Sequence, residues 1–110
     1  MRKLAGLITA VAVAVGFVVP CSAETVYVKY RGLLNLDRLE CEATDSSFVH
    51  RVCYDDRTGY LVVLLNDTYY HHCGVPDAVA QRLIEADSVG RYYNAVVRRR
   101  YDCRITPPPY

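Results

Sequence analysis

The sequence predicts a small α+β domain in which a three- to four-stranded antiparallel meander sheet is followed by two C-terminal helices packed on one face. Three observations predict this class. Segments rich in β-branched and aromatic residues alternate with turn residues between positions 48 and 73. Apolar residues then recur at helical spacing between positions 75 and 97. Four of the five cysteines lie between positions 41 and 103, and this even set predicts a fold stapled by disulfides.

Residues 1–23 have the composition of a secretory signal peptide. A basic Arg2-Lys3 pair precedes an uncharged, largely apolar run over 4–19, and small residues close the segment. A membrane anchor is the alternative, but the run is shorter than the roughly 20 residues that a spanning helix needs. We therefore expect cleavage after Ala23, a periplasmic or secreted protein, and no stable membrane anchor after cleavage.

After the leader, the sequence divides into three parts. Residues 24–45 hold an N-terminal strand and an irregular segment, and residues 46–103 hold the main domain. Residues 104–110 form a proline-rich tail that we expect to be extended and mobile. The full chain has 13 basic and 12 acidic side chains, so loss of the leader leaves it close to neutral.

The N-terminal part contains one expected strand. Residues 25–31 alternate, which places Val26, Val28 and Tyr30 on one face, and a glycine ends the strand. Residues 33–42 mix leucines with charged residues, so we expect an irregular segment that a cysteine ties down.

The main domain begins with three expected strands. They cover Phe48–Tyr54, Leu61–Leu65 and Thr68–Cys73, and turns at 55–59 and 66–67 join them. The middle strand is apolar throughout, which indicates a central strand covered on both faces.

A simple meander sets the register of these strands. With Tyr54 opposite Tyr60 and Tyr60 opposite Cys73, the side chains of Cys53 and Cys73 lie on different faces. The two cysteines also lie two strands apart, at about 10 Å, which is beyond disulfide reach. This register disfavours a Cys53–Cys73 bridge, although one bulge would reverse the face argument.

The exported chain keeps an even number of cysteines, which predicts disulfides in an oxidising compartment. These cysteines are Cys41, Cys53, Cys73 and Cys103. A metal site involving His71, His72 and Cys73 is the alternative, but no Cys-x-x-Cys pair is present and neighbouring strand residues face opposite sides. We expect two disulfides, with the three possible pairings left open, and no metal or cofactor.

Two amphipathic helices should follow the strands. Val75-Pro76-Asp77 has the composition of a helix start, because proline suits the first turn and an acidic residue complements the helix dipole. The first apolar stripe includes Val79 and Leu83. Ser88 can cap a second helix, whose apolar stripe comprises Val89, Tyr92, Tyr93, Val96 and Val97.

This order of elements, with the motifs inside it, resembles the KTSC domain over roughly residues 46–103. The matching features are Ser47, Tyr54-Asp55, Leu61, Val63, Val75-Pro76, the run from Ala86 to Asn94, and Arg100-Tyr101. His72 stands where the family has the second tyrosine of a Tyr-x-Tyr motif that begins here at Tyr70. The family is named after the C-terminal extension of some lysyl-tRNA synthetases. The resemblance implies the fold and carries no established function; nucleic-acid binding has been suggested from the synthetase context.

Two clusters supply the candidate binding residues. The first combines Tyr70 and His72 with the neighbouring His71, and the second is a basic, aromatic group near the second helix. The second group comprises Tyr92, Arg98, Arg99, Arg100 and Tyr101. No catalytic residue is assigned, because an oxidised cysteine is not a nucleophile and no Ser-His-Asp pattern is visible.

These clusters favour a small exported, non-catalytic binding or accessory module with an unknown partner, either a protein or an anionic polymer. One alternative is nucleic-acid or polyanion binding through Arg98–Arg100 and the neighbouring tyrosines. The acidic residues of positions 37–67 argue against it, because they would repel a polyanion. The other alternative is a small hydrolase around His71 or His72, which requires a concave pocket and a second polar group beside a histidine.

Overall fold

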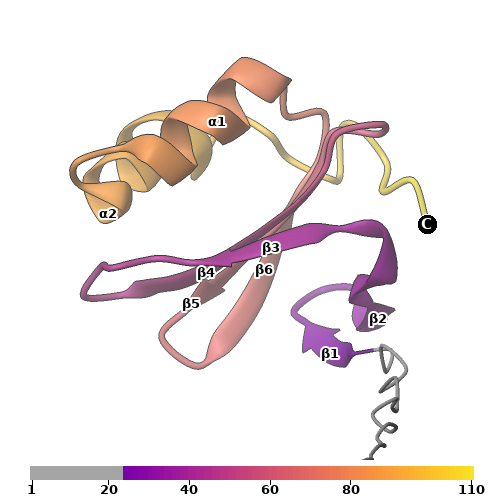
Figure 1. The fold of residues 1–110 in the computed structure, drawn as a ribbon. Helices are drawn as coiled ribbons and strands as arrows, with labels where there is room; N and C mark the ends of the chain where they lie inside the picture. The colour runs from indigo at the N-terminus through magenta and orange to yellow at the C-terminus, as the bar shows by residue number, and fades with distance from the viewer. Residues whose placement is uncertain (1–23) are drawn as a thin grey trace, which may run out of the picture.

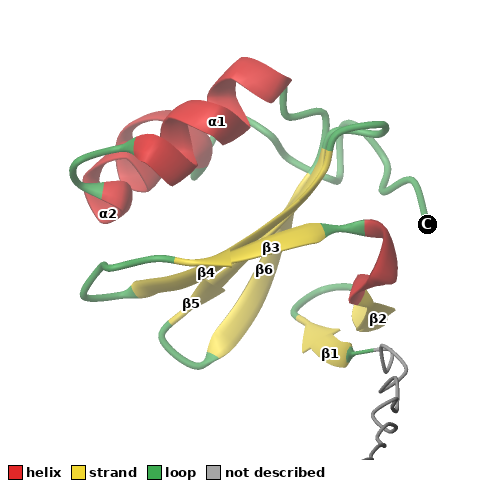
Figure 2. Cartoon of the chain, in the orientation of Figure 1, coloured by secondary structure: helices red, strands yellow, loops and turns green. Residues whose placement is uncertain are grey.

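The computed structural model describes residues 24–110, and its central feature is a twisted six-stranded mixed sheet (Figures 1 and 2). The strand order across the sheet is β2-β1-β6-β5-β4-β3. The strands are β1 (Thr25–Val28), β2 (Gly32–Asn35), β3 (Glu40–Ala43), β4 (Val49–Asp55), β5 (Tyr60–Leu65) and β6 (Thr68–His72). The α+β class and the antiparallel β4-β5-β6 meander are therefore confirmed.

The sheet has more strands than the three or four expected, and it is mixed rather than wholly antiparallel. The N-terminal part supplies three strands to the same sheet. Strand β1 pairs in parallel with β6, through Val28 and Tyr69, while the main-chain N–H of Lys29 donates to the Tyr69 oxygen at 2.9 Å. These pairings join residues 24–45 to the sheet of the main domain.

The single strand expected over residues 25–31 is a hairpin instead. The chain reverses after Val28, where Tyr30 takes a left-handed conformation with a φ of 71°. Gly32 therefore begins β2 rather than ending β1, and Tyr30 is 81% exposed instead of sharing the inward face of Val28. A side chain at positive φ is uncommon outside glycine and asparagine, so a turn at a tyrosine has little local signal in the sequence.

The segment 33–42, expected to be irregular, is also ordered. It contains most of β2, the short 3-10 helix η2 (Leu36–Arg38) and the start of β3. Leucine side chains at 34, 36 and 39 are buried against the sheet, which explains why leucines and charged residues alternate irregularly there.

The predicted register was wrong by one residue. Asp55, not Tyr54, pairs with Tyr60, because the turn contains four residues rather than five. A one-residue slip moves every side chain to the other face, so Cys53 and Cys73 share one face. The expectation that they do not bond still holds, because Cys53 aligns with Val62, which pairs with His71 two residues before Cys73.

Two disulfides form within residues 24–110, as the cysteine count predicted. Cys41 bonds Cys53 across the adjacent strands β3 and β4, where the two residues are direct partners. Cys73, just after β6, bonds Cys103. The second bridge holds the segment that follows the helices against the end of β6.

The helices lie on one face of the sheet, as expected (Figure 1). They are α1 (Asp77–Glu85), α2 (Val89–Tyr92) and the π-helical turn η3 (Tyr93–Val97) that continues α2. The predicted stripes are confirmed: Leu83, Val89, Tyr93 and Val97 are buried in the layer between helices and sheet. The Ser88 side chain caps α2 by accepting a hydrogen bond from the Arg91 N–H.

The opposite face of the sheet carries a second apolar layer, which the β1–β2 hairpin and η2 cover. Strand β5 is buried on both sides, since Leu61 and Val63 face the helices while Tyr60 and Val62 face the second layer. This confirms the expectation of a central strand covered on both faces.

The proline-rich tail does not extend freely away from the domain. Its residue Tyr110 packs against the second apolar layer, and its hydroxyl donates to Asp55 at 2.9 Å. The tail was expected to be extended and mobile, but Tyr110 docks it on the domain. Within residues 24–110, none of the helices has the length and apolar character to cross a bilayer. The expected signal peptide, residues 1–23, lies outside the described residues.

Candidate functional site

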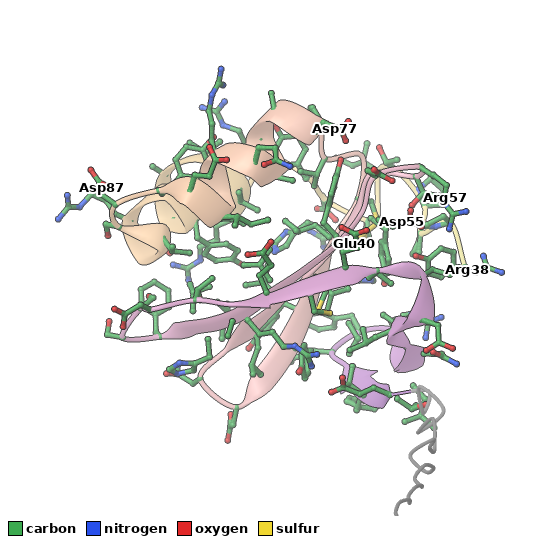
Figure 3. The ribbon with its side chains drawn as sticks, in the orientation of Figure 1. Arg38, Glu40, Asp55, Arg57, Asp77 and Asp87 are labelled. Carbon is green, nitrogen blue, oxygen red and sulfur yellow. A yellow bond between two sulfur atoms is a disulfide. The ribbon has the colours of Figure 1, made fainter. Side chains whose placement is uncertain are left out.

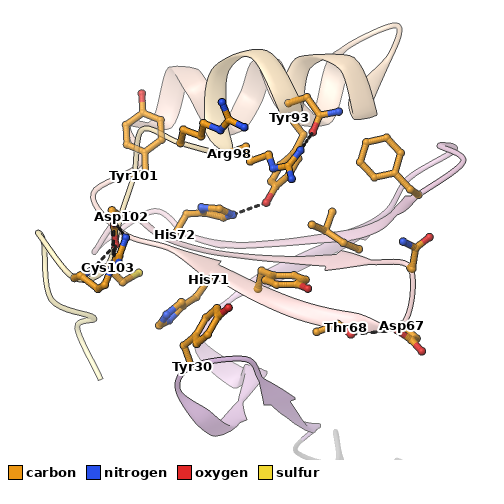
Figure 4. Close-up of a pocket in the computed structure, with 17 residues that line it drawn as sticks. Tyr30, Asp67, Thr68, His71, His72, Tyr93, Arg98, Tyr101, Asp102 and Cys103 are labelled. Atoms are coloured by element: carbon orange, nitrogen blue, oxygen red, sulfur yellow. Dashed lines mark hydrogen bonds and ion pairs between the residues drawn. The ribbon is translucent and has the colours of Figure 1, made fainter.

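A groove of about 960 Å³ follows the part of β6 that β1 leaves unpaired (Figure 4). Its walls come from η3 and the following segment on one side and from the hairpin residue Tyr30 on the other. Aromatic rings, histidines and arginines dominate its lining. Such a concave surface with a few polar groups is the usual form of a ligand-binding site.

Alternation along β6 sends its side chains to both sides of the sheet. Tyr70 and His72 are paired with residues of the helix-facing layer, whereas His71 is paired with Val62 of the second layer. In Figure 4, His72 points toward Tyr93, and His71 points toward Tyr30. The groove therefore wraps around the strand edge and includes both histidines.

His72 is buried and hydrogen bonded to the helix. Its Nε2 lies 2.9 Å from the Tyr93 hydroxyl, and the two rings meet edge to face. Burial, aided by the nearby His71, lowers the pKa of His72 to about 4. Burial also raises the pKa of Tyr93 to about 12. Both groups are neutral near pH 7, so this pair connects η3 to β6 without carrying charge.

His71 makes a similar contact on the other side of the sheet. Its Nδ1 lies 2.9 Å from the hydroxyl of the buried Tyr60. Burial lowers the pKa of His71, the Arg31 charge lowers it further, and Asp102 partly opposes both. The pocket and polar partner that a hydrolase requires are thus present, but the partner is a tyrosine whose pKa burial raises to about 12.

Only part of the arginine cluster lines the groove. Arg98 and Arg99 line the groove, and Arg104 joins them, whereas Arg100 does not. In η3 the N–H of Arg98 donates to the Tyr93 oxygen, five residues back. Such a turn is wider than an α-helical one. Arg98 also donates to the Asn94 side-chain oxygen at 3.4 Å.

Acidic side chains are concentrated at the opposite edge of the sheet. Asp37, Glu40, Glu42, Asp56 and Asp77 line a separate hollow between the β3 edge and the start of α1. Three strand spacings, about 14 Å, separate β3 from β6, which exceeds the Debye length of about 8 Å at physiological salt. In Figure 3, Glu40, Asp55 and Asp77 lie in the half of the view that contains the start of α1, whereas Asp87 lies at the other end.

The groove itself contains two carboxylates. Asp102 is ion-paired with Arg104 at 2.8 Å, and the hydrogen bonds from Arg104 lower the pKa of Asp102 to about 2. Asp67 accepts a hydrogen bond from the Thr68 hydroxyl. Arg98 and Arg99 therefore leave the groove rim with a net positive charge.

Five of the seven candidate binding residues line this one groove: Tyr70, His72, Arg98, Arg99 and Tyr101. Tyr92 packs against the helix-facing core instead, and Arg100 is exposed outside the groove. Sequence reasoning missed Tyr30, Asn94 and Arg104 as groove residues. Asn94 belongs to the quoted family motif and Arg104 lies four positions after Arg100, whereas Tyr30 carried no signal.

Metal coordination has no support in the described part of the chain. Among residues 24–110, no three His, Cys, Asp or Glu side chains are grouped closely enough to hold an ion. Both cysteine pairs are consumed by disulfides, and such bonds are typical of proteins outside the reducing cytoplasm.

A family model for the KTSC domain matches residues 45–101, which is more than half of the chain. The chain belongs to the KTSC family. The KTSC match covers β4 to β6, both helices and most of the groove wall, but excludes Tyr30 and Arg104. No curated protein gives a match.

Several residues inside the KTSC match stabilise the fold. The Tyr54 hydroxyl donates to the Val75 main-chain oxygen at 2.6 Å, which ties β4 to the start of α1. Gly59, at a φ of 78°, lies against Val75 and accepts its N–H at 2.9 Å. Asn94 differs, because it is exposed on the groove rim beside Arg98.

Proposed function

We propose that this protein is an exported, non-catalytic binding module of KTSC type and that the groove along β6 and η3 is its binding site. The observation that carries this proposal is the convergence of Tyr70, Arg98, Arg99 and Tyr101 on one concave surface. Tyrosine suits such a role because it combines a large apolar area with a polar tip.

The absence of catalysis is supported by the state of the reactive groups. Both histidines have lowered pKa values and each contacts a tyrosine hydroxyl. All four cysteines of residues 24–110 are oxidised, so none supplies a thiolate nucleophile. A hydrolase around His71 or His72 would have a pocket. It would have no cysteine nucleophile, because the cysteines are bonded in pairs.

Export is supported by the leader-like residues 1–23 and by the two disulfides. Protein isolated from the periplasm or the medium should have an intact mass that begins at Glu24. That residue is already part of the fold, since its carboxylate binds Arg51 and its main-chain oxygen accepts the Leu36 N–H. Protein recovered only from the cytoplasm with Met1 retained would contradict export.

Polyanion or nucleic-acid binding is the second candidate function, and one observation now favours it. Of the acidic residues that were expected to repel a polyanion, Asp37, Glu40, Glu42 and Asp56 line the separate hollow beside β3, and Asp67 lines the groove. Arg98 and Arg99 lie beside tyrosines in the groove and outweigh its carboxylates together with Arg104. Cationic grooves with stacking aromatic rings are typical of single-strand binders. Arg100 provides a matched control, because it has the same charge but lies outside the groove.

The test compares binding of short single-stranded RNA and of heparin at two salt concentrations. If the groove binds them, Arg98→Ala/Arg99→Ala should weaken binding at least ten-fold and flatten its salt dependence, whereas Arg100→Ala should have a small effect. Equal losses in both variants would indicate non-specific charge attraction. Binding that is absent near physiological salt would leave a protein partner as the ligand class to test, with the same two variants.

A further inference from the structure

The side chain of Tyr110 packs on the second apolar layer near the β4–β5 turn, at a site separate from the groove. The tyrosine hydroxyl donates to Oδ2 of Asp55 at 2.9 Å. Its ring meets the Tyr60 ring edge to face, with centroids 5.4 Å apart. The guanidinium of Arg38 lies 4.9 Å from the ring centroid, within the range of a cation–π contact.

These three residues, Arg38, Asp55 and Tyr60, surround the phenol from different sides, and we call them the Tyr110 socket. They come from η2 and from both ends of the β4–β5 turn. Figure 3 shows Arg38 and Asp55 at the end of the molecule where the chain finishes. The main-chain oxygen of Tyr110 also accepts a weak hydrogen bond from Arg31 Nε at 3.4 Å.

Asp55 gives the socket its chemical selectivity. The residue is only 2% exposed, and a buried carboxylate requires hydrogen-bond donors. Burial by itself would raise the pKa of Asp55, but donors from Tyr110, the Arg57 N–H and Thr58 outweigh it, so the pKa lies below its usual range. The Arg57 N–H donates to Oδ1 at 3.0 Å. Oδ2 is thus the atom that selects a phenol over a plain benzene ring.

The segment that carries Tyr110 joins the domain through one turn and three prolines. Ile105 and Thr106 close a turn by donating to the Asp102 oxygen, which anchors the start of the tail. The three prolines that follow lack N–H groups and favour an extended conformation. Pro107 and Pro109 are exposed and Pro108 is partly buried, while Tyr110 makes the hydrogen bonds and ring contacts described above.

We propose that the Tyr110 socket is a recognition site for a tyrosine carried on a proline-rich segment, and that residues 106–110 occupy it as an intramolecular ligand. A partner protein that presents a Pro-Tyr segment then competes with the chain's own tail for the same residues. The site is independent of the groove proposed above, which lies along β6.

Effective concentration sets the affinity that this proposal requires. A short linker presents a tethered ligand at an effective concentration on the order of millimolar. For Tyr110 to occupy the socket in most molecules, the separate peptide must bind an empty socket with a Kd below about 1 mM. In wild type the tail competes, so the same peptide should bind several-fold more weakly.

The experiment uses the full exported chain with Tyr110→Ala, which empties the socket. A synthetic Thr-Pro-Pro-Pro-Tyr peptide, amidated at its end, is titrated into ¹⁵N-labelled protein, and NMR shifts near residues 55–60 report binding. A Thr-Pro-Pro-Pro-Phe peptide and free tyrosine amide separate recognition of the hydroxyl from recognition of the proline-rich segment. Arg38→Ala is a suitable second variant, because Arg38 is exposed and its loss should not disturb folding.

The expected result is saturable binding of the tyrosine peptide to Tyr110→Ala and at least five-fold weaker binding of the phenylalanine peptide. The tyrosine peptide should also bind more weakly when Arg38→Ala or Asp55→Asn is combined with Tyr110→Ala. Absence of binding at several millimolar peptide overturns the proposal. Equal binding of both peptides, or equal binding to wild type and Tyr110→Ala, overturns it as well. If Tyr110→Ala fails to fold, Tyr110→Phe keeps the ring and should be displaced by the tyrosine peptide more readily than wild type.

Discussion

The buried His72 should make the protein sensitive to mild acid. Its pKa lies at about 4 in the folded protein, compared with 6.5 for an unperturbed histidine. Because the folded-state pKa is the lower one, the unfolded state binds more protons between these values. The stabilisation is therefore complete above pH 6.5 and is lost as the pH falls toward 4.

The linkage relation gives the size of this loss. From pH 7 the free energy of unfolding should fall by about 2 kcal/mol at pH 5 and by about 3 kcal/mol at pH 4 through His72 alone. Paired carboxylates such as Asp55, whose pKa is lowered, add their own losses at more acidic pH. Measurements between pH 7 and pH 5 therefore isolate the histidine contribution best.

The assay is urea unfolding followed by far-ultraviolet circular dichroism, since the chain has no tryptophan. His72→Gln removes the titrating group, so its unfolding free energy should vary less with pH than that of wild type, by about 2 kcal/mol between pH 7 and pH 5. His71 remains in both proteins and cancels in the comparison. The exposed His50 supplies the control His50→Gln. Parallel pH dependences for wild type and His72→Gln would refute the argument.

The remaining predictions concern the helices and the disulfides. Leu83→Ala should lower the free energy of unfolding by about 2–5 kcal/mol, because Leu83 is fully buried. Pro76→Ala should lower it much less, because Pro76 precedes the first helical turn. Urea unfolding that ranks the two variants the other way would show the helix phase to be wrong. Gly90→Ala should cost about 1–3 kcal/mol by the same assay, since the new Cβ would lie 2.5 Å from a ring carbon of Phe48, and Phe48→Leu should relieve part of the loss. Thiol labelling of denatured, unreduced protein should give no adduct on the exported chain, and two or more adducts would contradict the pairing. Reduction should lower the melting temperature, since the disulfide-closed loops of 12 and 30 residues contribute about 3 and about 4 kcal/mol in the chain-entropy model.

The sequence predicted the elements whose hydrophobic period is uninterrupted. Residues of β5 are apolar throughout, and Leu83 and Val97 lie on clear helical stripes, so burial alone determines these elements. The hairpin at Tyr30 could not be predicted in this way. Its alternation continues through the turn, and the turn lacks the Asn-Gly or Asp-Gly pair that usually marks one.

The candidate site was predicted in composition but not in geometry. Tyr70 and Arg98 are 28 positions apart, and their convergence depends on the π-helical turn η3 that precedes the arginines. The separation of Glu40 and Glu42 from the groove depends on the place of β3 at the far edge of the sheet. Neither the wider turn nor the strand order has a local sequence signal.

The parallel pairing of β1 with β6 affects the order in which the protein folds. Val28 and Tyr69 are partners, so β1 cannot pair with β6 until about forty further residues of the chain are available. Contacts between residues distant in sequence form slowly, because a long loop must close first. The β4–β6 meander, with its short turns, should form early, and the N-terminal hairpin should dock late. Until then, the apolar side chains of β1 and β2 are exposed to any chaperone that accompanies the chain.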